Sequence, residues 1–532
     1  MKDLIDTITQ LKARGDLVAL WAYLRLVVVD LLNRGELRHA FILATMLAKT
    51  GNRDPLVSAA LALGGMVFSR PDEERAGMEA LRAQADALSE IQQEDLYRTL
   101  LPVVEKALGP SPHPRDYSDA HQAQILRKGE IYRAASPFLR AMLDQDAPVP
   151  VLSLEKMRQK YEEHPVMINN PLPPADAPHS PRRVLVAMRE RTLFGRPPPG
   201  QPARAADYGL RIAMAMREYG WQTERHDFRV SDMSQVREDC QSIVERCRQL
   251  QTELLVIDLN VLGGLEGVQI STQMITQLRR ENPSIRVLAC AIDATFLTNT
   301  LIDLAPHLDL VWSSVEPSLP VWKHPALDGK VLLTVPLPPA GNTFTPDIPL
   351  IPEMLFAGTA SVTINRILWL TTAERIGLPI RKRLSSQYTD DGLPPLESYA
   401  LYIKSIRDAT CILNFSMRAF PPPTYYVNGR TFEGILAGAL LIQETAPETY
   451  HYFIPGEHFL EFATLAELRS IVRFITENRD EAEEVRRRGN AFAREHYNDT
   501  ALIGYIDKRL YFPDLQHHRG SAPASCRGDN LP

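Results

Sequence analysis

The sequence predicts an α/β protein with two doubly wound parallel-sheet domains that follow an all-α domain. Three observations support this fold class. Residues 1–145 carry apolar residues at helical spacing. Residues 183–335 alternate between short apolar runs and helical patterns, and the order strand, helix, strand returns at residues 410–442. A chain of 532 residues is too long for a single core, so we expect about three domains.

Residues 1–145 predict an antiparallel array of helices joined by short turns. Breaks fall at Gly15, Gly35, Gly51 and Pro71. The expected helices are Asp3–Arg14, Leu17–Asn33, Glu36–Lys49, Pro55–Phe68, Asp72–Ser89 and Asp95–Leu108. Glycine and other small residues at close helix contacts make the region resemble tetratricopeptide-type repeats, although the full repeat consensus is absent. Such an array either grips a protein or peptide acceptor or caps the next domain.

A proline-rich linker at 146–182 leads to the first sheet domain, expected at 183–345. Its expected strands are 183–188, 222–228, 253–259, 286–292, 308–313 and 330–335, with helices at 203–219, 231–250 and 268–281. The loop 192–201 contains two glycines but no G-x-G-x-x-G pattern. We therefore exclude a dinucleotide site there and expect a loop over the cleft.

The second sheet domain is expected at 346–512, before a disordered tail at 513–532. Its first strand ends at Gly358, and a helix with Arg366 follows. The remaining expected strands are 378–384, 410–415 and 439–442, with helices at 398–407, 432–438, 465–478 and 479–496. Strand, helix and strand in this order indicate a second parallel sheet.

Composition excludes several classes of function. The formal net charge of −6 favours neither nucleic acid nor an anionic membrane as a partner. The five cysteines are scattered without a C-x-x-C pair, which indicates a reducing compartment and no structural zinc. The N-terminus has charges throughout and no apolar signal region, and the apolar run 20–32 is too short to span a bilayer. We expect a cytoplasmic protein without a transmembrane segment.

The stretch 414–444 carries the strongest functional signal. A strand ends at Asn414 and Phe415, a proline-rich loop follows, and a helix starts after Gly429. A helix start beside the carboxyl ends of parallel strands is a natural seat for a phosphate. Arg430 adds a bidentate phosphate donor, and Glu433 can accept hydrogen bonds from a ribose diol. The alternative is an ordinary surface pair of Arg430 and Glu433 at i,i+3 spacing.

The motif GRTFEGILAG, followed by PGEH and two helices, resembles the donor-binding half of GT-B glycosyltransferases. The similarity is strongest to the group 1 family members that resemble the spore-maturation protein CgeB, and it covers about residues 355–510. It implies two Rossmann-like domains that face a cleft, with an acceptor side at 183–345 and a donor side at 346–512. It also implies that the helix 500–510 crosses back to the first sheet.

The resemblance implies a nucleotide-sugar donor site formed by nine residues. They are Gly358, Arg366, Asn414, Ser416, Arg430, Thr431, Phe432, Glu433 and Gly438. At the first position of the glutamate pair typical of retaining enzymes stands Tyr425, so neither retention nor inversion is fixed. The sequence has no convincing D-x-D, and we expect no essential metal and no cofactor besides the nucleotide-sugar co-substrate. The acceptor is expected to be a protein or a glycan.

An inverting reaction needs a base on the acceptor side. Asp293 ends the strand VLACAID and is our candidate, with a helix N-cap as the alternative. The leading hypothesis is a glycosyltransferase. The rivals are an inactive scaffold that binds partners through its helical N-terminus, and another GT-B chemistry such as an epimerase or a phosphorylase.

Overall fold

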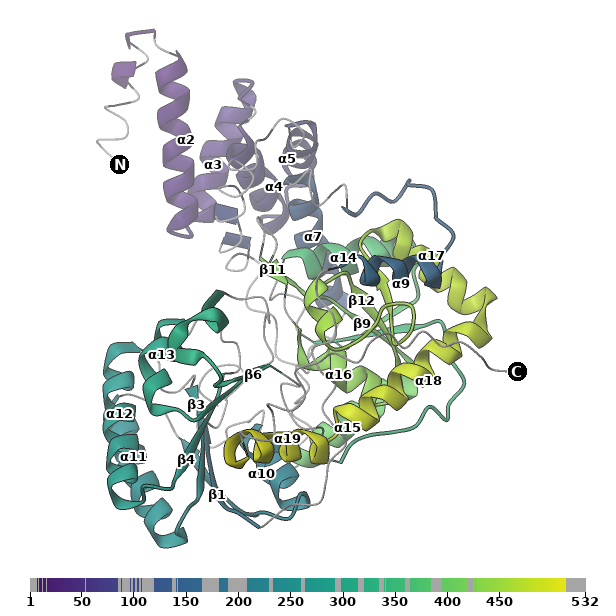
Figure 1. The fold of residues 1–532 in the computed structure, drawn as a ribbon. Coiled ribbons are helices and arrows are strands. Elements are labelled where there is room, and N and C mark those ends of the chain that lie inside the picture. The colour runs from purple at the N-terminus through teal and green to yellow at the C-terminus, as the bar shows by residue number, and fades with distance from the viewer. Residues whose placement is uncertain are drawn as a thin grey trace.

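The computed structural model describes residues 7–512 in three parts, a helical array and two parallel sheets (Figure 1). Within this range it leaves out 8, 12, 16, 53, 85–87, 89–95, 97–98, 101–102, 105–106, 108–118, 136–139, 141, 165–180, 190–207, 229–232, 260–263, 292–297, 314–319, 334–338, 340, 359–363, 384–394, 420–423 and 426. The expected loop 192–201 and the tail 513–532 lie outside the described residues, as do half of the helix expected at 3–14 and more than half of the one expected at 95–108. The α/β class with two parallel sheets and a helical N-terminal region is confirmed.

The helical array contains α2 (Leu17–Asn33), α3 (Leu37–Lys49), α4 (Pro55–Val67), α5 (Pro71–Gln84) and α7 (Asp119–Ala135). Asp54 caps α4 by accepting from the Leu56 amide, as its place before Pro55 favours. Gly77 of α5 lies directly against the backbone of Ala62 in α4, where a side chain would not fit. These close helix pairs agree with the small residues noted in the sequence.

The first sheet consists of β1 (Arg183–Arg189), β2 (Gln222–Phe228), β3 (Leu254–Asp258), β4 (Arg286–Cys290), β5 (Leu310–Ser313) and β6 (Val331–Leu333). All pairs are parallel, in the order β2-β1-β3-β4-β5-β6. The helices α11 (Met233–Leu250), α12 (Gly264–Glu281) and α13 (Thr298–Leu304) cover one face, and α10 (Tyr208–Glu218) covers the other (Figure 1). Short 3-10 turns lie at Ala305–His307, Pro320–Lys323 and Pro325–Leu327.

The second sheet has the order β13-β12-β9-β7-β8, again entirely parallel. Its strands are β7 (Met354–Ala357), β8 (Ile380–Arg383), β9 (Cys411–Asn414), β12 (Leu440–Glu444) and β13 (Leu460–Phe462). Its helices are α14 (Ile364–Arg375), α15 (Pro395–Ala409), α16 (Gly429–Leu436), α17 (Leu465–Glu477) and α18 (Arg479–His496), with a 3-10 turn at Pro447–His451. Within the stretch that we expected to be a proline-rich loop, the short strands β10 (Met417–Ala419) and β11 (Thr424–Tyr425) pair antiparallel.

The described residues form three apolar cores, and two of these cores join different parts of the molecule. One covers the outer face of the first sheet. A second lies between the sheets and includes Val186 of β1, Leu355 of β7 and Ile503. The third joins the helical array to the other face of the second sheet, with Leu63 and Phe356 in the same cluster. In the described part of the chain, the helical array therefore packs as a cap on the second sheet domain, through α7 and α14, and not on the domain that follows it in sequence.

Two chain segments cross between the parts. The last described helix, α19 (Asp499–Tyr511), returns to the first sheet domain and packs on α10, as the resemblance implied. The guanidinium of Arg182 lies 3.9 Å over the ring of Tyr511. The expected linker 146–182 contains a helix, α9 (Leu154–Glu162), capped by Ser153 and tied to the second sheet domain by the pair Lys160–Glu461 at 2.8 Å.

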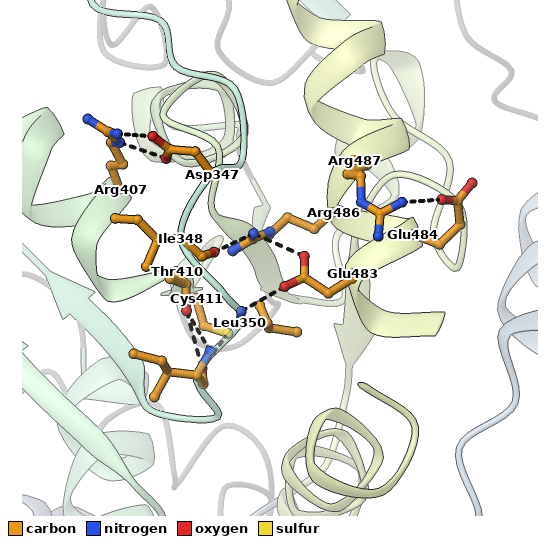
Figure 2. A network of polar contacts seen from close by, with 11 residues as sticks. Asp347, Ile348, Leu350, Arg407, Thr410, Cys411, Glu483, Glu484, Arg486 and Arg487 are labelled. Atoms are coloured by element: carbon orange, nitrogen blue, oxygen red, sulfur yellow. Dashed lines mark hydrogen bonds and ion pairs between the residues drawn. The ribbon is translucent and has the colours of Figure 1, made fainter. Parts of the chain in front are cut away.

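The segment 347–351, which leads into β7, is fixed by a polar network (Figure 2). Arg486 of α18 is 3% exposed, donates to the Ile348 carbonyl at 2.7 Å and pairs with Glu483 at 3.0 Å. Glu483 in turn accepts from the Leu350 amide at 2.7 Å. Burial raises the pKa of the nearby Cys411 thiol to about 12, so this cysteine is an inert packing residue.

Candidate functional site

The strand order of the second sheet places its topological switch point between β7 and β9. At a topological switch point, the connections from two neighbouring strands leave in opposite directions. From these neighbours the chain continues to β8 on one side and to β12 on the other. In open parallel sheets, ligands bind beyond the carboxyl ends of the two strands at such a point. Here those ends are Ala357 with Gly358, and Asn414 with Phe415. Two residues selected from the sequence, Gly358 and Asn414, therefore flank the expected ligand crevice.

Arg430 connects the two strand ends. It lies in the first turn of α16, and its guanidinium donates to the Ala357 carbonyl at 2.7 Å and to Asn414 Oδ1 at 3.2 Å. Gly358, with φ of +143°, leaves the space that the guanidinium occupies. The structure thus brings Gly358, Asn414 and Arg430 together at the switch point.

Asn414 is fully buried and forms the centre of a polar network. Its Nδ2 donates to Thr431 Oγ1 at 3.1 Å and to Gln443 Oε1 at 2.7 Å. Gln443 Nε2 donates to Ser416 Oγ at 2.5 Å. Thr431 and Ser416 were expected at this site, whereas Gln443 was missed. The signal that could have found it is a glutamine at the end of the apolar strand ALLIQE, because a buried amide needs partners.

The start of α16 has no side-chain cap. Asn428 occupies the N-cap position, but its Nδ2 donates to Asn414 Oδ1 at 2.9 Å and to the Phe415 carbonyl at 3.1 Å. Its Oδ1 is buried and has no hydrogen-bond partner among the described residues. The uncapped helix start and the cation of Arg430 together make the switch point favourable for an anion.

Glu433 and Arg430 are not the surface pair that the spacing alone allowed. Glu433 is 7% exposed, and its carboxylate accepts from Tyr399 at 3.3 Å and from Tyr402 at 3.4 Å. The guanidinium of Arg211, which belongs to α10 of the first sheet domain, lies 3.4 Å from Glu433 Oε1. Arg211 was missed by sequence reasoning, because nothing local links it to a residue in another domain.

The other expected residues have diverse surroundings. Phe432 is 1% exposed and packs on the rings of Tyr452 and Tyr497, with centroids 5.2 and 5.4 Å away. Gly438 ends α16 with φ of +78° and lies against the backbone of residues 344–346. Arg366 is buried and donates to the Phe415 carbonyl at 3.5 Å. Asp293, the candidate base, lies outside the described residues.

The described part of the chain contains no group of three or more His, Cys, Asp or Glu side chains arranged to hold a metal ion. Among its helices, none combines the length and the apolar character needed to cross a membrane. The four described cysteines are buried free thiols.

A family model described as "Glycosyl transferase-like" matches residues 377–502. The match includes β9, α16 and β12, and with them Asn414, Arg430, Glu433 and Gln443. The resemblance of the C-terminal half to glycosyltransferases is thereby confirmed for this segment, and the finer likeness to CgeB stays a prediction. A comparison with curated protein sequences finds no match.

Solved structures with a similar arrangement include glycosyltransferases at low sequence identity. Anabaena Alr3699/HepE in complex with UDP and glucose is 10% identical, with 62% of this chain and 99% of that chain covered and a TM-score of 0.39. Sucrose-phosphate synthase from Thermosynechococcus elongatus is 11% identical, with coverages of 62% and 99% and a TM-score of 0.38. AviGT4, a glycosyltransferase involved in avilamycin A biosynthesis, is 12% identical, with coverages of 62% and 97% and a TM-score of 0.36.

Proposed function

We propose that the protein is a GT-B glycosyltransferase that transfers a sugar from a nucleotide-activated donor to a protein or glycan acceptor. One observation carries the proposal: Arg430 joins both sides of the switch point beside an uncapped helix start, within the segment that matches the glycosyltransferase family model. Preorganised donors of this kind stabilise a departing nucleoside diphosphate without a metal. We also place the protein in the cytoplasm, in keeping with its buried free thiols.

In this reaction the acceptor oxygen forms a bond to the anomeric carbon while the bond to the diphosphate breaks. The diphosphate leaves as an anion toward Arg430 and the start of α16, and Glu433 contributes to holding the ribose. For an inverting course, Asp293 takes the proton of the acceptor hydroxyl. Tyr425, at the position of a carboxylate in many retaining enzymes, favours the inverting course.

The test is a thermal-shift screen against UDP, GDP, dTDP, CMP and their sugars, followed by product analysis with the nucleotide that binds. A ligand at a hundredfold excess over its dissociation constant stabilises the folded state by about 2.7 kcal/mol. We expect a rise in Tm with one nucleotide that Arg430→Gln abolishes. Arg407→Gln, which removes a guanidinium from an ion pair with Asp347 in the same domain, is the matched control and should keep the shift.

A second candidate function is an inactive scaffold. Two observations favour it: Tyr425 replaces a carboxylate, and the carboxylate of Glu433 is already engaged by Arg211 and two tyrosines. In that case no nucleotide raises Tm at millimolar concentration. The helical array, which is anchored on α14, would then be the part to use in a search for protein partners.

A further inference from the structure

The ion pair between Arg211 and Glu433 joins the two sheet domains. Arg211 lies in α10, the first described helix after β1, and Glu433 lies in α16, 222 residues later. The distance between Arg211 Nη1 and Glu433 Oε1 is 3.4 Å. Both side chains are buried, with 2% and 8% of their side-chain surface exposed. Because neither domain contains both partners, the pair forms only when the domains are together.

The surroundings of the pair fix its geometry. The guanidinium of Arg211 lies 3.9 Å over the ring of Tyr399, whose hydroxyl donates to the same carboxylate oxygen that faces Arg211. Tyr402 donates to the other oxygen. Planar stacking and a fixed fork of donors are properties of arginine that lysine lacks. The carboxylate is thus oriented by one residue of the first sheet domain and two of the second.

This carboxylate lies beside the candidate donor site. It is 3.7 Å from the position that a Cβ would take at Gly429, the first residue of α16, and Arg430 follows directly. A movement of the Glu433 side chain therefore takes place within one helical turn of Arg430, the residue that bridges the switch point.

Removal of one partner from such a pair leaves the other buried charge without its counter-charge. The closed arrangement would then lose stability relative to an open one, in which water solvates the remaining charge. Removal of both charges has no such penalty. Closure of the two sheet domains is therefore favoured when both charges, Arg211 and Glu433, are present or when both are absent.

We propose that Arg211 is a positioning residue that holds the Glu433 carboxylate at the start of α16 and so completes the donor site only when the two sheet domains are closed. This inference rests on the proposed function. Arg211 acts through Glu433 and needs no contact with the donor. The domain that carries the acceptor side thereby controls the residue that we assign to the ribose.

The experiment combines two readouts on the full chain with Arg211→Gln, Glu433→Gln and the double variant. Isothermal titration with the nucleotide found in the screen gives the affinity, and small-angle X-ray scattering of the ligand-free proteins gives the radius of gyration. We expect Arg211→Gln to weaken nucleotide binding by about tenfold to a hundredfold. When Glu433→Gln is already present, adding Arg211→Gln should cause no further loss of nucleotide affinity. Each single variant should have a larger radius of gyration than the wild type, and the double variant should return toward it.

Two further variants separate positioning from general stability. Arg211→Lys keeps the positive charge but lacks the forked donors of the guanidinium. Its affinity for the nucleotide should lie between those of the wild type and of Arg211→Gln. Arg248→Gln removes an exposed arginine paired with Glu281 in the same domain and should change neither readout. Additive losses in the two single variants, or an unchanged radius in all variants, would overturn the proposal. If no nucleotide binds the wild type, the proposed function fails, and the scattering comparison alone decides whether Arg211 controls closure.

Discussion

The guanidinium of Arg430 occupies the space in which a side chain at Gly358 would lie. Gly358 follows β7 with φ of +143°, and Arg430 reaches across it to the Ala357 carbonyl. The resemblance to glycosyltransferases placed Gly358 in the donor site. The contact gives the glycine another role, which is to admit the arginine that bridges the switch point.

We therefore expect Gly358→Ala to abolish the nucleotide-dependent rise in Tm. The added methyl group displaces the guanidinium, and the positive φ adds about 1–3 kcal/mol of backbone strain. Gly377→Ala is the matched control, since Gly377 also has positive φ but has no atom within 4 Å of its Cβ position. Both variants should lose stability in urea titrations, and only Gly358→Ala should lose the nucleotide response. An intact response in Gly358→Ala would show that the position of Arg430 does not matter for binding.

The second prediction concerns the polar network around Asn414. Asn414→Leu has a similar volume but leaves Gln443, Asn428 and Arg430 without one partner each. Buried groups that lose a hydrogen bond cost about 1–3 kcal/mol each, so we expect a loss of about 3 kcal/mol in urea unfolding. Asn342→Leu, which removes one bond to the Pro339 carbonyl in a half-buried turn, should lose less than half of that. Equal losses in both variants would contradict a network role for Asn414.

Most of the fold could be predicted because its signals are local. Strands such as Leu254–Asp258 are apolar on both faces, and helices such as Leu465–Glu477 begin with a capping box, here formed by Thr464 and Glu467. The helix α9 was missed because prolines dominate the segment around it, although Ser153 is a proper N-cap.

The candidate site could be predicted only in part. Asn414, Ser416 and Arg430 follow from the position of a strand end and a helix start. Gln443 lies opposite Asn414 in the register of β12 and β9, and this register is set by the packing of the whole sheet. Arg211 comes from a different domain and depends on how the two sheets meet. Contacts of this kind have no periodic signal in the sequence.

The third prediction tests the network that fixes the segment before β7 (Figure 2). Arg486→Met leaves the Ile348 carbonyl without its donor and the buried side of Glu483 without its cation. We expect a loss of about 3 kcal/mol in unfolding free energy. Its neighbour Arg487 is 60% exposed and pairs with Glu484, so Arg487→Met should change stability by less than about 0.5 kcal/mol. If urea titrations give similar losses of unfolding free energy for the two variants, Arg486 does not fix the segment before β7.

The last prediction concerns pH and His458. Its imidazole stacks on Phe492 with centroids 4.4 Å apart and accepts from the Ile454 amide through Nδ1. Burial, with smaller effects from Arg488 and His496, lowers the pKa of His458 to about 4. Between pH 6.5 and 4 the unfolded chain therefore binds a proton that the folded chain does not, and stability falls as pH falls. At pH 5 this loss is about 2 kcal/mol relative to pH 7.5.

His458→Asn keeps an acceptor but cannot titrate, so urea titrations at both pH values should show a pH dependence of stability that is smaller by that amount. An unchanged pH dependence of stability in His458→Asn would contradict the assignment.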